Sequence, residues 1–97
     1  MNCEQFLNIY DLSINIIDIR NKEDYNESHI SNSINIDHVD LILNYEKYLK
    51  QKEIYYIICD KGEVSEYVIR SINNPNYLLI NITDGFDNWK GPTISNI

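Results

Sequence analysis

The sequence predicts a small α/β domain in which a mainly parallel sheet carries helices on both faces. Apolar runs rich in β-branched residues recur at 14–19, 34–36, 54–58 and 77–81, as is typical of short buried strands. Segments with helical periodicity separate these runs, and parallel strands need such crossover connections. Because 97 residues suffice for one core but not for two, we expect a single domain over residues 1–97.

The expected helices lie before and between these strands. They cover about residues 3–10, 38–50 and 65–73, with shorter helical pieces at 22–25 and 86–90. Asn2, with Gln5 three residues later, has the pattern of a capping box for the first helix. Asp37 and Ser65 are expected to cap the second and third, since short polar side chains accept hydrogen bonds from free backbone N–H groups. Gly91-Pro92 is expected to end the last helical piece.

Composition and charge exclude several classes of partner. Fifteen acidic against eight basic residues give a net charge of −7, so neither nucleic acid nor an anionic membrane surface is an expected partner. No apolar run approaches the length of a membrane span, and residues 1–6 lack the features of a secretory signal. Two cysteines, Cys3 and Cys59, do not make a disulfide framework, so a reducing, cytoplasmic setting is expected.

The stretch from Ile54 to Ser65 is the strongest functional candidate. An apolar strand ends at Cys59, a short polar loop with one glycine follows, and a helix is expected to begin at Ser65. Such a loop can turn successive backbone N–H groups inward and form an anion-binding nest, to which the helix N-terminus adds positive potential. A cysteine facing that nest should be partly thiolate near neutral pH. The stretch alone is equally compatible with a buried cysteine that only closes a core strand.

Four motifs follow one another along the chain. They are Ile17-Asp18-Ile19-Arg20 with Glu23-Asp24-Tyr25 and His29-Ile30, then Cys59 with Gly62 and Ser65, then Asp84-Gly85-Phe86-Asp87-Asn88-Trp89, and finally Gly91-Pro92. In their order and spacing they resemble the single-domain rhodaneses, and the resemblance covers almost the whole chain from residue 14 onward.

The resemblance implies a rhodanese-type sulfurtransferase that needs no cofactor. Cys59 would attack the outer sulfur of a donor such as thiosulfate or a persulfide, become a persulfide, and pass the sulfur to a thiol or protein acceptor. Inward N–H groups would stabilise the bound anion. The implied cradle is the backbone of Asp60, Lys61, Gly62, Glu63, Val64 and Ser65, with Asp18 and Arg20 as supporting residues.

Departures from the family pattern bear on the donor. Family members active on thiosulfate commonly carry basic residues at the positions of Asp60 and Val64, whereas Lys61 is the only cation of this loop. The acidic loop opposes a dianionic donor and disfavours a thiolate, so a persulfide is the preferred donor. Outside the loop, Ser28 and Asp84 stand where the family has glycine, and Ser31-Asn32-Ser33 replaces Pro-Gly-Ala.

The other notable residues are interpreted structurally. Asp18 is expected to be a hydrogen-bonded structural carboxylate, and Arg20 to pair with Glu23 or Asp24. Cys3 is expected to be an exposed or half-buried terminal cysteine, rather than a resolving thiol, and Trp89 to lie in the core. His29 is expected to hold a turn and His38 to start a helix; with no further ligands in the pattern, no metal site is expected.

Two alternatives to a sulfurtransferase follow from the same loop. In the first, the chain is a rhodanese-like binding or regulatory module in which Cys59 is idle. In the second, it is a phosphatase or arsenate reductase, whose cysteine loop is one residue longer and ends in an arginine that clamps an oxyanion. Here Ser65 lies six residues after Cys59 and the next arginine is Arg70, so we reject phosphatase chemistry.

Overall fold

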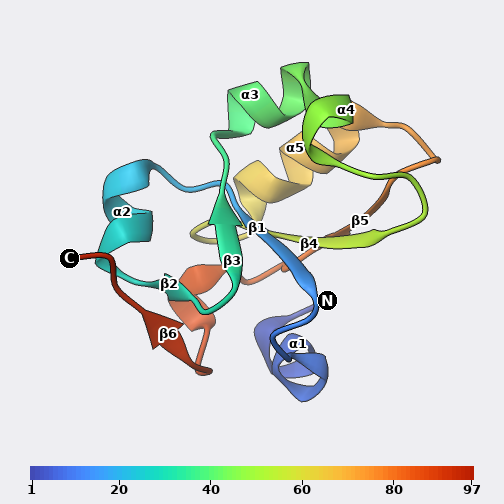
Figure 1. The fold of residues 1–97 in the computed structure, drawn as a ribbon. Coiled ribbons are helices and arrows are strands. Elements are labelled where there is room, and N and C mark those ends of the chain that lie inside the picture. The colour runs from blue at the N-terminus through green and yellow to red at the C-terminus, as the bar shows by residue number, and fades with distance from the viewer.

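A computed structural model describes the whole chain from Met1 to Ile97 as a four-stranded sheet with helices on both faces (Figure 1). The helices are α1 (Cys3–Ile9), α2 (Lys22–Glu27), α3 (His38–Leu43), α4 (Tyr45–Tyr48), α5 (Glu63–Ile72) and a 3₁₀ turn, η1 (Phe86–Asn88). The strands are β1 (Asn15–Asp18), β2 (His29–Ile30), β3 (Ser33–Asn35), β4 (Ile54–Ile58), β5 (Leu78–Asn81) and β6 (Thr93–Ile94).

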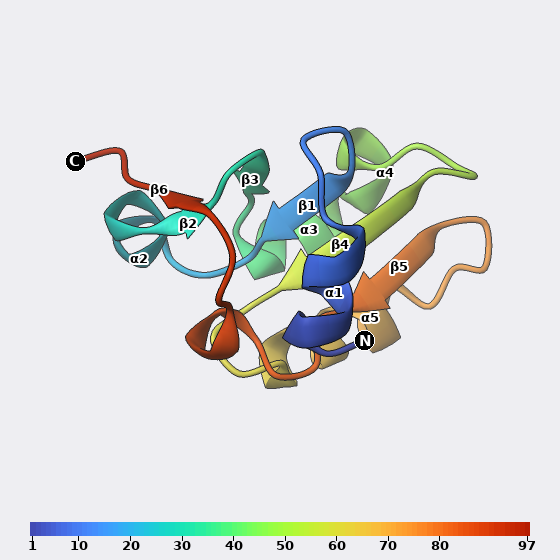
Figure 2. The ribbon, with the colours of Figure 1, turned by 90° about the horizontal axis from the view of Figure 1, so that it is seen from below.

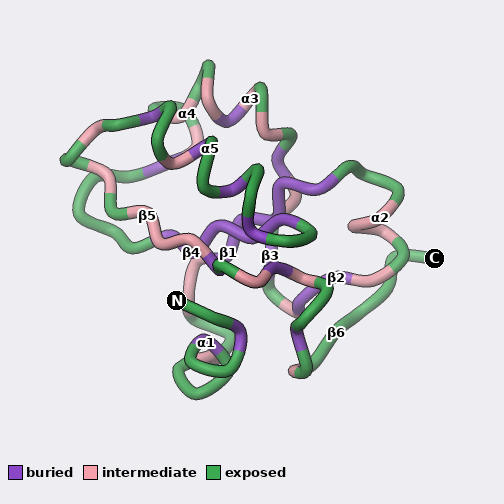
Figure 3. Tube along the Cα trace, turned by 180° about the vertical axis from the view of Figure 1, so that it is seen from behind, coloured by how far each residue is buried: buried purple, intermediate pink, exposed green.

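The main sheet is parallel, as the sequence predicts, with the strand order β3-β1-β4-β5. The central strands β1 and β4 are the most buried, since both of their faces are covered by helices. In β4 only the first residue is exposed and Tyr55 to Ile58 are buried. Figure 3 shows buried residues gathered along β1 and β4 in the middle of the molecule. Cys59 follows β4 directly and therefore lies at the carboxyl edge of the sheet.

Alternate residues of the central strands supply two separate apolar clusters. Ile17, Ile57 and Cys59 face α3, α4 and α5, where they pack with Leu41, Val68 and other residues of those helices. On the opposite face the buried residues are Cys3, Phe6, Ile16, Ile30, Tyr56, Ile58, Ile82 and Trp89. Figure 2 shows α1 in front of the sheet and α5 behind it. The two cysteines therefore belong to opposite faces of the sheet.

The first helix confirms its predicted cap. Asn2 accepts a hydrogen bond from the Gln5 backbone, and the Gln5 side chain accepts one from the Asn2 backbone. None of the helices has both the length and the apolar character that crossing a bilayer requires.

Two predicted helices have different bounds in the structure. The single helix expected over 38–50 is divided into α3 and α4 at Asn44, whose backbone (φ −131°, ψ 31°) leaves the helical region. The prediction that Ser65 caps the third helix is wrong, because α5 begins at Glu63 and its cap is Gly62. The glycine precedes the helix in a left-handed conformation, so the helix begins two residues earlier and Ser65 falls within its first turn.

A second, two-stranded sheet was not predicted. His29 and Ile30 of β2 pair antiparallel with Ile94 and Thr93 of β6. Strands of two residues are too short to give a recognisable alternation, so the sequence pattern does not reveal them. This small sheet joins the segment after α2 to the end of the chain (Figure 1).

Candidate active site at the Cys59 loop

The loop after β4 is held by backbone hydrogen bonds from the segment that follows β5. The Phe86 N–H donates to the Cys59 carbonyl over 2.8 Å, and the Asp87 N–H donates to the Asp60 carbonyl over 3.1 Å. Because both acceptors are backbone groups, these bonds fix the path of the loop whatever its side chains are. Sulfur and loop are thus positioned by residues far away in the sequence.

The Cys59 sulfur lies among polar groups of its own loop. The backbone N–H groups of Gly62 and Ser65 donate to Sγ over 3.1 and 3.3 Å, and Ser65 Oγ lies 3.2 Å away. First-turn N–H groups of a helix have no partner inside the helix, and Gly62 has no side chain to cap them. The sulfur therefore accepts a hydrogen bond from one of these N–H groups, that of Ser65, and this arrangement stabilises negative charge on the sulfur.

Of the six loop residues implied to form the cradle, Gly62 and Ser65 contact the sulfur through hydrogen bonds. Asp60, Lys61, Glu63 and Val64 are exposed, and no hydrogen bond links them to Sγ. Cys59 itself is only 4% exposed, so the loop covers most of the thiol. Only a small group can therefore reach this sulfur without movement of the loop.

Gly62 is required by the geometry of this loop. Its φ is +89°, a conformation that side chains rarely adopt, and a Cβ built on it would lie 2.0 Å from the Thr83 carbonyl oxygen. Both the backbone angle and the space therefore demand glycine. The same residue donates an N–H to the sulfur, so the sharp turn and the contact with Sγ depend on one position.

The amide of Asn81, at the end of β5, is a part of the site that sequence reasoning missed. Its Nδ2 donates to the Gly62 carbonyl over 3.1 Å, and its Oδ1 accepts from the Ser65 hydroxyl over 2.5 Å. Ser65 is fully buried. Asn81 ends a predicted strand at the same edge as Cys59, and that position was the only available signal.

Asp18 and Arg20 form a buried ion pair beside the loop. Arg20 Nη2 lies 2.7 Å from Asp18 Oδ2, and the guanidinium also donates to the Ser28 carbonyl. The prediction that Arg20 pairs with Glu23 or Asp24 is wrong, because Asp18 is buried with it at the end of β1 and needs a cation. Asp18 accepts hydrogen bonds from the Arg20 backbone and guanidinium, as expected for a structural carboxylate. The Arg20 guanidinium also covers the Phe86 ring at 3.9 Å.

An acidic depression lies next to the loop. Its volume is about 310 Å³, and it is lined by Arg20, Asp24, Glu27, Ser28, Asp60, Phe86 and Asp87. Burial raises the pKa of Asp60; Arg20 opposes this effect, and the carboxylates of Asp87 and Asp24 add to it. Since Arg20 is already paired with Asp18, the acidic side chains dominate the charge beside the Cys59 loop.

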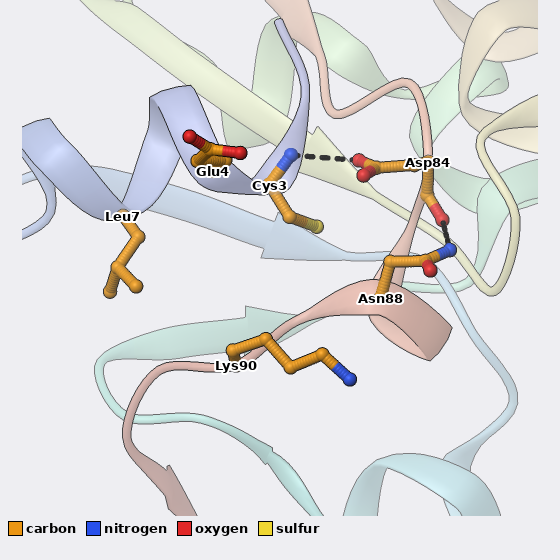
Figure 4. A pocket seen from close by; sticks show the side chains of 6 residues that line it. All are labelled: Cys3, Glu4, Leu7, Asp84, Asn88 and Lys90. Atoms are coloured by element: carbon orange, nitrogen blue, oxygen red, sulfur yellow. Dashed lines mark hydrogen bonds between the residues drawn. The ribbon is translucent and has the colours of Figure 1, made fainter.

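Cys3 lies in different surroundings from Cys59. It was expected to be exposed or half-buried, but only 4% of it is exposed, because α1 packs onto the sheet. Its thiol donates to the Gly85 carbonyl, and its N–H donates to Asp84 Oδ1 over 2.8 Å (Figure 4). Burial and the Asp84 carboxylate raise the pKa of Cys3 to about 12. This thiol is therefore protonated and structural, and Asp84 has a structural role where the resemblance leads one to expect glycine.

The remaining predicted residues have structural positions. Trp89 is buried, as expected, and the His29 ring contacts the Tyr25 carbonyl at 2.6 Å. His38 is the first residue of α3. Arg70 is exposed on α5 and lies 3.8 Å from Glu66. No group of three His, Cys, Asp or Glu side chains is arranged to hold a metal ion.

Comparison with known proteins identifies the fold of the chain that carries this site. The family model described as the Rhodanese-like domain matches residues 3–92. A rhodanese-like domain protein from Staphylococcus aureus superimposes with a TM-score of 0.74, at 25% identity, over 90% of this chain and 83% of that chain. A rhodanese-related protein from Thermoplasma volcanium superimposes with a TM-score of 0.76, at 24% identity, over 97% and 95% of the two chains.

A curated relative adds a biochemical context. The Bacillus subtilis (strain 168) protein YrkF, named as a candidate sulfur carrier, is 32% identical over 84 residues, which are 86% of this chain and 45% of the relative. The chain thus spans less than half the length of the curated relatives it matches.

Proposed function

The chain belongs to the rhodanese-like domain family, and we propose that it is a sulfurtransferase that carries sulfane sulfur as a persulfide on Cys59. One observation supports this proposal more than any other. The Cys59 sulfur accepts hydrogen bonds from the backbone N–H groups of Gly62 and Ser65 over 3.1 and 3.3 Å, and this environment is suited to a thiolate nucleophile. A cysteine that only filled the core would not need two donors directed at its sulfur.

The proposed chemistry needs only a donor, this thiol and an acceptor. The Cys59 thiolate attacks the outer sulfur of the donor, and the bond between the two donor sulfurs breaks. The donor leaves as a thiolate, or as sulfite if it is thiosulfate, and a new S–S bond forms on Cys59. An acceptor thiolate then attacks the outer sulfur, and the electron pair of the broken bond returns to Cys59. The N–H groups of the loop stabilise Sγ whenever it is anionic.

A small persulfide is the proposed donor in preference to thiosulfate. The depression beside the loop is lined by the carboxyl groups of Asp24, Glu27, Asp60 and Asp87, and its one cation, Arg20, is paired with Asp18. A dianion approaching this surface is repelled, whereas a persulfide carries at most one charge on its sulfur. The proposed acceptor is a thiol or a protein, and the proposed setting is a reducing cytoplasm. We propose that residues 1–97 form a single domain that carries out both steps.

Mass spectrometry of the intact protein tests the loading step. The purified protein is incubated with thiosulfate or with a small persulfide, next to the Cys59→Ser and Cys3→Ser variants. We expect the mass of one sulfur atom to be added from the persulfide, to the protein and to Cys3→Ser but not to Cys59→Ser. Cys3→Ser is the matched control because its thiol is buried on the other face.

The second candidate function is a binding or regulatory module in which Cys59 is idle. The observation in its favour is the acidic surface around a thiol that is 4% exposed. The two candidates differ in one result of the loading experiment. If neither donor adds sulfur to a folded protein, the carrier proposal fails and the binding module becomes the preferred function.

A further inference from the structure

We propose that Asn81 is a positioning residue for Cys59, and that it acts by holding the hydroxyl proton of Ser65 away from the sulfur. The inference rests on the proposed function of Cys59 as nucleophile. Its basis is a chain of contacts that runs from Sγ through Ser65 and Asn81 back to the Gly62 carbonyl, in the loop that surrounds the sulfur.

The orientation of the Asn81 amide follows from its partners. Nδ2 lies 3.1 Å from the Gly62 carbonyl oxygen, which can only accept a hydrogen bond, so the NH₂ group must face the loop. Oδ1 then faces Ser65, 2.5 Å from its hydroxyl oxygen. An amide oxygen also only accepts, so the Ser65 hydroxyl must be the donor of this bond.

The position of that proton determines what the sulfur receives. A serine hydroxyl carries one hydrogen, and here it is committed to Asn81. The 3.2 Å contact between Ser65 Oγ and Cys59 Sγ is therefore made by the thiol hydrogen, which points at the hydroxyl oxygen. All donors and acceptors in this chain of contacts are satisfied when Cys59 is a thiol.

Loss of the thiol proton breaks this pattern. A thiolate at 3.2 Å would face a lone pair of Ser65 Oγ unless the hydroxyl turns its hydrogen from Asn81 to the sulfur. Asn81 and the thiolate thus compete for one proton, and Asn81 thereby favours the thiol. In a persulfide the charge lies on the outer sulfur, so the hydroxyl hydrogen can return to Asn81 until Sγ becomes a leaving thiolate again.

The pH dependence of Cys59 alkylation tests this coupling. Iodoacetamide rates are measured across pH in a Cys3→Ser background, so that one thiol is followed. We expect Asn81→Ala to move the midpoint of the profile to lower pH by about half a unit or more, since the hydroxyl is then free to donate to the thiolate. In a Ser65→Ala background, Asn81→Ala should not move the midpoint, because the hydroxyl through which Asn81 acts is absent.

Two further variants separate this role from a structural one. Asn15→Ala removes an amide that donates to a strand carbonyl at the opposite end of the sheet, and it should not move the midpoint. Asn81→Asp still accepts from Ser65 and adds negative charge, so it should move the midpoint to higher pH. If Asn81→Ala does not fold, the test uses Asn81→Asp alone. The inference is supported if Asn81→Asp raises the midpoint pH of alkylation more in the protein that keeps Ser65 than in the Ser65→Ala variant.

The outcomes that overturn the inference are distinct from failure of the proposed function. The Glu66 N–H also donates to the Gly62 carbonyl, over 3.3 Å, so Asn81→Ala leaves that oxygen with a partner. No shift, an upward shift, or equal shifts with and without the Ser65 hydroxyl would show that Asn81 does not act through this proton. Alkylation needs no sulfur donor, so the coupling can hold even where persulfide loading fails.

Discussion

Gly62 donates its backbone N–H to Cys59 Sγ over 3.1 Å from a left-handed conformation with a φ of +89°. One residue thus ends the polar loop, caps α5 and contacts the sulfur. The peptide N–H reaches Sγ because the chain reverses at this point, and only glycine reverses here at low cost. The reactivity assigned to Cys59 therefore depends on a backbone angle as much as on the thiol itself.

Replacement of Gly62 by alanine is expected to abolish sulfur loading. The new Cβ would lie 2.0 Å from the Thr83 carbonyl oxygen, so the loop must move away from Thr83, and this movement is expected to displace the residue 62 N–H from its position at the sulfur. We expect a loss of about 2 kcal/mol or more in the free energy of unfolding, from the strained φ and the clash. Urea denaturation and intact mass measure the two effects. Val64→Ala is the control in the same loop; it should load normally, and if it fails as Gly62→Ala does, the N–H cradle is not the cause.

Removing the charge of Asp60 should improve loading from thiosulfate. Asp60 lines the depression beside the loop. Removing one negative charge there should lower the free energy of the approaching dianion by about 1 kcal/mol, which corresponds to a roughly threefold to tenfold faster loading rate. We expect Asp60→Asn to give this gain with thiosulfate and a smaller one with a small persulfide, which carries at most one negative charge on its sulfur. Glu46→Gln, on α4, is the matched control. Equal gains from both donors, or equal gains in the control, would refute charge selection by this surface.

Cys3 should be inert wherever Cys59 reacts. Burial and the Asp84 carboxylate raise the pKa of Cys3 to about 12. This thiol therefore stays protonated from neutral pH up to a pH of about 9. Peptide mapping after brief alkylation of the native protein should find the label on Cys59 alone, and on both cysteines after denaturation. Native labelling of Cys3 at a rate similar to that of Cys59 would contradict its assignment as structural.

The buried pair of Asp18 and Arg20 should dominate the electrostatic contribution to stability. The Asp18 and Arg20 side chains are 0% and 5% exposed, and Asp18→Asn would leave the guanidinium without a counterion. We expect a loss of about 3 kcal/mol in the free energy of unfolding by urea denaturation. The exposed contact between Arg70 and Glu66 is the control: Arg70→Gln should cost less than about 1 kcal/mol. Equal costs for the two changes would mean that Arg20 finds another partner.

The parts of the fold that follow from local pattern could be predicted from the sequence. The β-branched runs of β1 and β4 and the capping box at Asn2 each carry their signal within a few residues. The start of α5 was misplaced because Ser65 is a good capping residue and the left-handed Gly62 is a weaker signal. Strands β2 and β6 depend on a pairing between distant segments, which no local pattern encodes.

The site divides in the same way. Cys59 and Gly62 were identifiable because a strand, a loop and a helix follow one another in the chain. Asn81 was not, since its contacts with Gly62 and Ser65 join β5 to α5 across the edge of the sheet. The partner of Arg20 was misassigned for a related reason: charge pattern favours exposed neighbours, whereas burial of Asp18 makes pairing obligatory.

Discharge of a loaded protein is the measurement that tests the carrier role of Cys59 most directly. The protein is loaded from a persulfide labelled with heavy sulfur, freed of donor, and mixed with a small thiol acceptor, while mass spectrometry follows both. We predict that the protein loses one labelled sulfur as the acceptor gains it, and that Cys59→Ser neither loads nor transfers. A loaded protein that keeps its sulfur, or transfer by Cys59→Ser at the same rate, would contradict the carrier role.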